Sequence, residues 1–107
     1  WGWPLDIMSP LPRIAHEPTS LTGLGHRLFS LSMARREPGT AGPGFFFCMG
    51  GDLESLDEGG GRNPDGHGFT VFGEVVAGFD VLRRIMARAE PGDRLTNRIP
   101  IHGARRA

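Results

Sequence analysis

Two short apolar segments of the chain carry patterns that are typical of β-strands. Residues 28–34 (LFSLSMA) alternate in size and polarity, which predicts a strand with one buried face. Residues 45–49 (FFFCM) form a short aromatic run bounded by glycines, which predicts a strand buried on both sides. Residues 35–44 between them contain two prolines and three glycines, which interrupt helix and strand alike. A long loop beside a strand of phenylalanines predicts a small apolar pocket at this place.

The apolar pattern in the second half of the chain predicts one more strand and one helix. Residues 69–76 (FTVFGEVV) form the strand, in which Gly73 marks a bulge. Residues 79–90 predict the only helix, because their apolar side chains recur every three or four positions and arginines occupy the opposite face. Pro91 and Gly92 end this helix. The arginines are interpreted as its solvated face rather than as a nucleic-acid patch.

The two ends of the chain are less regular. Residues 1–27 contain four prolines and no periodic pattern, which predicts a lead-in of extended segments and turns before a core in residues 28–107. Trp1 and Trp3 are expected to cover part of that core as an apolar lid. At the other end, Ile99 and Ile101 alternate in a predicted closing strand, which Pro100 keeps at the edge of a sheet.

Composition and charge narrow the range of functions. A chain of 107 residues is one domain at most. Its net charge is zero and it has no apolar run of transmembrane length, so we predict neither a nucleic-acid nor a membrane partner. The single cysteine, Cys48, excludes an internal disulfide framework and favours a reducing compartment. The first residues lack the pattern of a signal peptide, and we therefore predict a cytoplasmic location.

The polar residues show no spacing that is typical of a metal or nucleophile site. The acidic residues of segment 52–58 do not fit an EF-hand, which needs a fixed glycine and a terminal glutamate, and they predict a solvated turn. The histidines are scattered, so surface or capping roles are expected for them. They are His16, His26, His67 and His102. No Ser/His/Asp or Cys/His set is visible, and we predict no metal and no cofactor.

The order of these segments resembles the cyclophilin family of peptidyl-prolyl isomerases. The resemblance rests on SMAR at residues 32–35, the Pro/Gly-rich loop, FFFC at 45–48, LD at 56–57 and VFGEVVAGFDVL at 71–82. It covers about residues 16–85 without a break in order. It implies a mainly β fold, a cyclophilin-like β-barrel with one helix at about 79–90. It also implies isomerisation of X-Pro bonds in proline-containing peptides or unfolded polypeptides, without a cofactor.

The resemblance further implies a set of substrate-binding residues. Phe46 matches the second phenylalanine of the family's FF pair, which forms the floor of the pocket for the proline ring. Leu56 matches a leucine that forms a wall of the same pocket. The edge whose backbone pairs with the peptide is matched by Ala34, Arg35 and Arg36. Gly44 replaces the glutamine of the family's Ser-Gln-Phe-Phe motif, and Phe69 stands where many members have histidine.

Other features of the family have no counterpart in this sequence. The family's catalytic arginine precedes a Phe-x-Gln-Gly-Gly segment that would lie before Trp1, together with strands that close the barrel. We therefore predict an incomplete barrel, whose open sheet edges are available for self-association, and a chain with weak or no isomerase activity. Two alternatives stay open. The chain could be a non-catalytic module that binds proline-containing peptides, or an interaction domain that pairs through its open edge.

Overall fold

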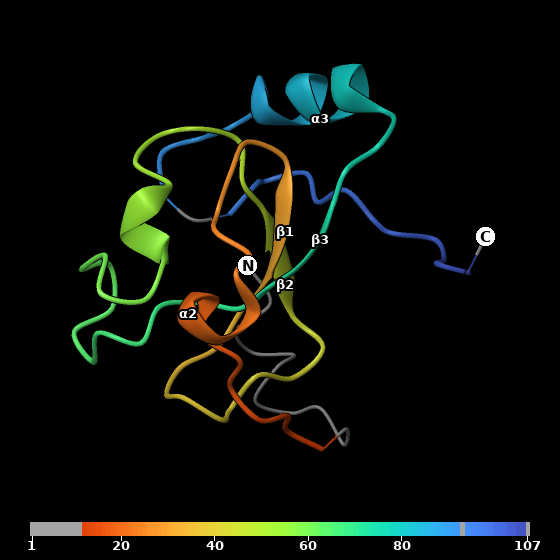
Figure 1. Cartoon of the computed structure of the whole chain (residues 1–107). Coiled ribbons are helices and arrows are strands. Elements are labelled where there is room, and N and C mark those ends of the chain that lie inside the picture. The colour runs from red at the N-terminus through yellow and green to blue at the C-terminus, as the bar shows by residue number, and fades with distance from the viewer. Residues whose placement is uncertain (1–11, 93, 107) are drawn as a thin grey trace.

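The described part of the chain is built around one small antiparallel sheet. A computed structural model describes residues 12–92 and 94–106 (Figure 1). Its sheet has the order β2-β1-β3, with β1 at Ser30–Met33, β2 at Phe45–Phe47 and β3 at Val71–Glu74. The sheet is open rather than closed into a barrel, with little helix around it. This arrangement confirms a mainly β fold that is consistent with a partial cyclophilin-like barrel.

The pairing of β1 with β3 contains a bulge. Leu31 lies opposite Gly73, but its neighbour Ser32 lies opposite Val71, so that Phe72 is an extra residue on β3. A Cβ atom at Gly73 would lie 3.4 Å from Leu31 Cδ1, at the limit of an ordinary contact. The bulge predicted at this glycine is therefore confirmed, one residue away, and glycine suits the close approach of the two strands.

Strand β2 lies at an edge of the sheet and has two different faces. Phe46, which pairs with Ser32 of β1, points to the side that carries the core, and it packs against that core. Phe45 and Phe47 point to the other side and are 39% and 38% exposed. The prediction of a strand buried on both sides is wrong, because the described residues cover only one side of β2.

Helix α3, at Phe79–Met86, confirms the predicted helix but ends earlier than expected. After Met86, the backbone N–H groups of Arg88 and Ala89 donate to carbonyl groups three residues before them, which tightens the last turn and ends the helix. The helix is attached to the sheet through Phe29, whose ring centroid lies 4.7 Å from that of Phe79.

The structure contains a second, single-turn helix, α2 at Thr19–Thr22, which the sequence did not predict. It follows Pro18 and ends at Gly23, which has a φ of 74° and donates its N–H to Thr19 O. Proline before a turn and a left-handed glycine after it are ordinary boundary signals. The signal was present in the sequence, but one turn is too short to show apolar periodicity.

The predicted closing strand near the C-terminus is wrong. Residues 94–106 contain no strand, and Ile101 is 70% exposed. Figure 1 shows this end of the chain projecting away from the sheet. Two alternating isoleucines around a proline offer too few backbone donors and too little buried area to hold a sheet edge. The lid predicted for Trp1 and Trp3 falls outside the described residues.

The core is a small cluster on one face of the sheet. Cys48, Leu56 and Phe69 are buried together, with Phe46 and Leu53 packed against them. These residues come from β2, from the segment after it and from the approach to β3, so one face of the sheet is covered by the chain that directly follows β2. Within the described residues, no helix has the length and apolar character needed to cross a bilayer.

Candidate functional site

A cavity of about 630 Å³ lies on the face of the sheet that carries the core. This volume is in the range of small-ligand sites. Its apolar wall comes from β2 and the core, and its rim is polar. The apolar residues are Phe46, Cys48, Met49, Leu53, Leu56 and Phe69, and the polar ones are Arg35, Arg36, Glu37, Asp52, Arg62 and Asn63. Phe47, whose side chain points to the other face of β2, also borders the cavity. The pocket predicted beside the phenylalanine strand is confirmed.

The cavity brings together most of the residues that the sequence singled out. Arg35, Arg36, Phe46, Leu56 and Phe69 all line it. Ala34 and Gly44 do not line it and lie beside each other next to β1 and β2, where Ala34 N–H donates to Gly44 O at 3.0 Å. A role in substrate binding stays a prediction for all seven.

Two aromatic rings and a leucine form the apolar wall. The centroids of Phe46 and Phe69 lie 5.4 Å apart with an interplanar angle of 84°, the edge-to-face arrangement that aromatic pairs favour. Leu56 ends the short 3-10 helix η1 at Glu54–Leu56, and its carbonyl accepts a hydrogen bond from Phe69 N–H at 2.9 Å. This backbone contact holds the aliphatic wall next to the aromatic one.

Gly68 makes that contact possible. Its φ is 67°, and a Cβ atom at this position would lie 2.5 Å from the carbonyl carbon of Asp57. Backbone atoms cannot yield that far, so a residue with a side chain would push the two segments apart. The glycine therefore allows Phe69 to approach η1 as closely as it does.

The rim contains a buried arginine that is bound within the chain. Arg35 is 4% exposed, and its guanidinium donates to both carboxylate oxygens of Asp65, at 2.9 and 3.2 Å. The hydrogen bonds from Arg35, followed by that from the backbone N–H of His67, lower the pKa of Asp65 to about 2. The carboxylate of Asp65 is thus kept ionised at the edge of the cavity.

A second rim residue has an unused acceptor. Asn63 Oδ1 is buried and lacks a hydrogen-bond partner among the described residues. A buried polar atom without a partner is uncommon in folded proteins. Asn63 itself lines the cavity, so this unused acceptor belongs to a residue of the polar rim.

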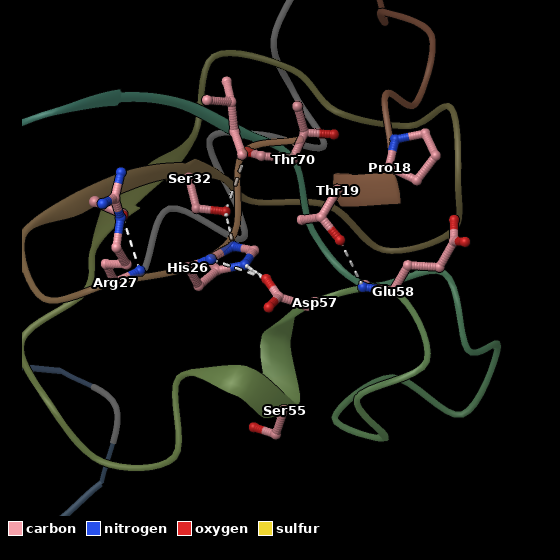
Figure 2. Close-up of polar contacts among 12 residues, drawn as sticks. Pro18, Thr19, His26, Arg27, Ser32, Ser55, Asp57, Glu58 and Thr70 are labelled. Carbon is pink, nitrogen blue, oxygen red and sulfur yellow. Dashed lines mark hydrogen bonds and ion pairs between the residues drawn. The ribbon is translucent and has the colours of Figure 1, made fainter. Parts of the chain in front are cut away.

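Behind the cavity wall lies a buried polar network that the sequence did not reveal. Figure 2 shows His26 between Asp57 and Ser32. The Nδ1 atom of His26 lies 2.7 Å from Asp57 Oδ1, and its Nε2 atom lies 2.8 Å from Ser32 Oγ. The backbone N–H of His26 donates to the same Asp57 oxygen, and Ser32 Oγ–H is also within 3.1 Å of Thr70 O.

This network could not be predicted from the sequence, for a physical reason. His26 is 5% exposed, so the expectation of a surface or capping role is wrong for this histidine. Asp57 lies 31 residues further along the chain, and only the fold brings its carboxylate to the imidazole. No periodicity or local motif reports such a contact.

The network has the order of a Ser-His-Asp triad but cannot act as one. A nucleophilic serine must reach the substrate carbonyl. Ser32 is 0% exposed and does not line the cavity. The network instead joins three supports of the cavity, because Asp57 follows Leu56, Ser32 is on β1 and Thr70 follows Phe69.

The other candidate nucleophile, Cys48, is also expected to be unreactive. Burial, and secondly the nearby charge of Asp57, raise the pKa of its thiol, which keeps the sulfur protonated near neutral pH. Among the described residues, no group of three or more His, Cys, Asp or Glu side chains is arranged to hold a metal ion.

Comparison with known proteins supplies the remaining observation. A family model described as Cyclophilin type peptidyl-prolyl cis-trans isomerase/CLD matches residues 8–106, which is nearly the whole chain. No curated protein and no solved structure matches it. The matched range includes every residue that lines the cavity.

Proposed function

Because the chain belongs to the cyclophilin-type peptidyl-prolyl cis-trans isomerase family, we propose that its cavity binds proline-containing segments of polypeptides and lowers the barrier to isomerisation of their X-Pro bonds. That barrier is about 18–20 kcal/mol. Lowering it needs an apolar socket for the proline ring and donors that favour the twisted amide. It needs no nucleophile, metal or acid–base pair.

One observation carries this proposal. Phe46, Leu56 and Phe69 come from separate segments, and the fold places all three on one cavity wall. A proline ring is a small apolar group that fits an aromatic and aliphatic socket of this kind. The polar rim beside it, which includes Arg62 and Asn63, offers hydrogen-bonding groups to the peptide backbone on either side of the proline.

We propose that catalysis by this chain is weak. A donor aimed at the reacting amide commonly accounts for about 3 kcal/mol of transition-state stabilisation. Arg35 is a poor candidate for that donor, since its N–H groups already bind Asp65, Gly68 and Arg36. Donating to a proline nitrogen would cost Arg35 one of these bonds. The same cavity could therefore serve a non-catalytic module that holds proline-containing peptides.

A third possibility uses a different surface. Strand β2 is an edge strand, and Phe45 and Phe47 are exposed on its second face. An exposed aromatic edge favours pairing with another chain. This observation supports an interaction domain, and it rests on Phe45, which does not line the cavity, as well as on Phe47, which does.

Exchange spectroscopy of an Ala-Pro peptide, with and without the purified chain, tests these proposals together. Accelerated cis–trans exchange supports the enzyme, whereas unchanged exchange with selective shifts of Phe46 and Phe69 signals supports the binding module. Unchanged exchange and unchanged signals, in a protein with well-dispersed resonances, would overturn both. Phe72→Ala is the matched control, because Phe72 is 51% exposed and does not line the cavity.

A further inference from the structure

Arg35 uses every donor it has within its own chain. A guanidinium carries five N–H groups. The Nε–H group donates to Gly68 O at 2.9 Å, and one Nη1–H donates to Arg36 O at 2.8 Å. The other Nη1–H and one Nη2–H form the paired bonds to Asp65, and the last Nη2–H donates to Gly68 O. No donor is left for a peptide in the cavity.

The same guanidinium lies over an aromatic wall of the cavity. Its central carbon is 5.3 Å from the ring centroid of Phe69, within the range of a cation–π contact. Phe46 also contacts that ring, edge to face, with the two centroids 5.4 Å apart. The Phe69 ring is therefore in contact with both Arg35 and Phe46, and loss of the guanidinium removes one of these two contacts.

Asp65 extends this arrangement to the polar rim. It lies in the loop of residues 58–68, where its Oδ1 atom also accepts a bond from the backbone N–H of His67 at 2.8 Å. The loop is closed by Gly59 N–H donating to Gly66 O at 2.9 Å. Arg62 and Asn63, which line the cavity, belong to the same loop. The bonds between Arg35 and Asp65 thus tie this rim loop to β1, which ends just before Arg35.

We propose that Arg35 is a positioning residue, which fixes the Phe69 ring and anchors the 58–68 loop through Asp65 so that the cavity is preformed for a proline-containing peptide. The proposal rests on the proposed function for the identity of the ligand. It does not rest on that function for the arrangement itself. Arg35 acts here through Phe69 and the loop, and its side chain does not contact the peptide.

This assignment explains why the residue is an arginine rather than a lysine. A lysine ammonium has three donors on one nitrogen and no planar fork, so it cannot bind both carboxylate oxygens of Asp65 in the paired geometry that Arg35 uses. Arg35→Lys keeps the positive charge and removes the planar guanidinium. Asp65→Asn keeps the shape of the Asp65 side chain and removes its negative charge, whereas Asp65→Glu keeps that charge on a longer side chain.

The decisive experiment measures peptide affinity and the ligand-free state of the same variants by NMR. For Arg35→Lys we expect the dissociation constant for an Ala-Pro peptide to rise about tenfold, since small displacements of a preformed site have large effects. Asp65→Asn should raise it about threefold, and Asp65→Glu should restore part of that loss. Asp80→Asn is the matched control, because Asp80 forms an exposed pair with Arg84 at 3.9 Å and its variant should bind like the wild type.

The ligand-free measurement separates the two proposals. In the wild type, the Arg35 Nε–H resonance should exchange slowly with water, and Asp65→Asn should speed that exchange and shift the Phe69 ring signals. If these changes occur while the wild type binds no peptide, the positioning role stands and the proposed function fails. If Arg35→Lys and Asp65→Asn both bind peptide like the wild type, or leave the Phe69 signals unchanged, the positioning role is overturned. Should Arg35→Lys fail to fold, the two Asp65 variants still give this answer.

Discussion

The two faces of the sheet carry the same kind of side chain and differ in what covers them. On one face, Phe46 packs with buried core residues and lines the cavity. On the other face, three phenylalanines meet edge to face at centroid distances of 5.7 and 6.1 Å and remain partly exposed. They are Phe45, Phe47 and Phe72, which are 39%, 38% and 51% exposed. Hydrophobicity alone therefore does not decide which face becomes the core.

Chain order and polar contacts make the difference. The segment that follows β2 folds back over one face, and buried polar side chains hold it there. His26 binds Asp57 behind Leu56, and Arg35 binds Asp65 beside Phe69. A short chain buries little apolar area, so such networks contribute a large share of its specificity. The second face has no equivalent contacts among the described residues.

Truncation of one side chain on each face should give the largest contrast. Leu56→Ala removes a buried wall residue and should lower the free energy of unfolding by about 2–4 kcal/mol. Phe72→Ala should lower it by less than about 1 kcal/mol, since its ring is half exposed. Urea unfolding followed by circular dichroism measures both. Equal losses would show that the exposed face contributes to stability as much as the core face.

Removal of the buried serine hydroxyl should have the next largest effect. Ser32→Ala leaves the Nε2 atom of His26 without its partner in a buried site, which should cost about 1–3 kcal/mol. Ser20→Ala is the matched control, because Ser20 Oγ donates to Glu58 on the surface at 2.9 Å. Thermal unfolding of the two variants gives the comparison. A loss in Ser20→Ala as large as that in Ser32→Ala would contradict a special role for the buried network.

These contrasts also show what the sequence can and cannot predict. Alternating and periodic patterns located the three strands and the start of α3, because each depends on neighbours within a few residues. The aromatic pocket wall was predictable from the same patterns together with the family resemblance. Contacts between distant side chains were not, since His26 meets Asp57 across 31 residues and Arg35 meets Asp65 across 30.

The errors have a physical cause of the same kind. A run of three phenylalanines fits a strand buried on both sides and an edge strand with one uncovered face equally well. Only the number of covering segments separates the two, and that number is a property of the whole fold. The prediction of a strand near Ile101 was wrong for a similar reason, because an alternating segment forms a strand only where the edge of another strand is within reach.

Substitutions on the exposed aromatic face should change dye binding and self-association more than they change the free energy of unfolding. Replacing Phe45 and Phe72 together by threonine should lower the free energy of unfolding by less than about 1 kcal/mol per site. The same variant should bind less of the dye ANS and elute at a smaller apparent size if the chain self-associates through this face. Dye fluorescence and size-exclusion chromatography test this. Unchanged dye binding would place the accessible apolar surface elsewhere.

The smallest expected effect is a change in the acid titration of one carboxyl group. The hydrogen bonds from Arg35, followed by that from the backbone N–H of His67, lower the pKa of Asp65 from 3.8 to about 2, so the bond between Arg35 and Asp65 should be fully present above about pH 4 and lost as the pH falls towards 2. The sign follows from the ionised form being the one that Arg35 binds. The carbon-13 shift of the Asp65 carboxyl, followed from pH 6 to pH 1.5 at about 0.1 M salt, measures the midpoint directly. Arg35→Gln should move that midpoint up towards 3.8, whereas Arg84→Gln on α3 should leave it in place. A midpoint near 3.8 in the wild type would mean that Arg35 does not hold the rim loop in solution.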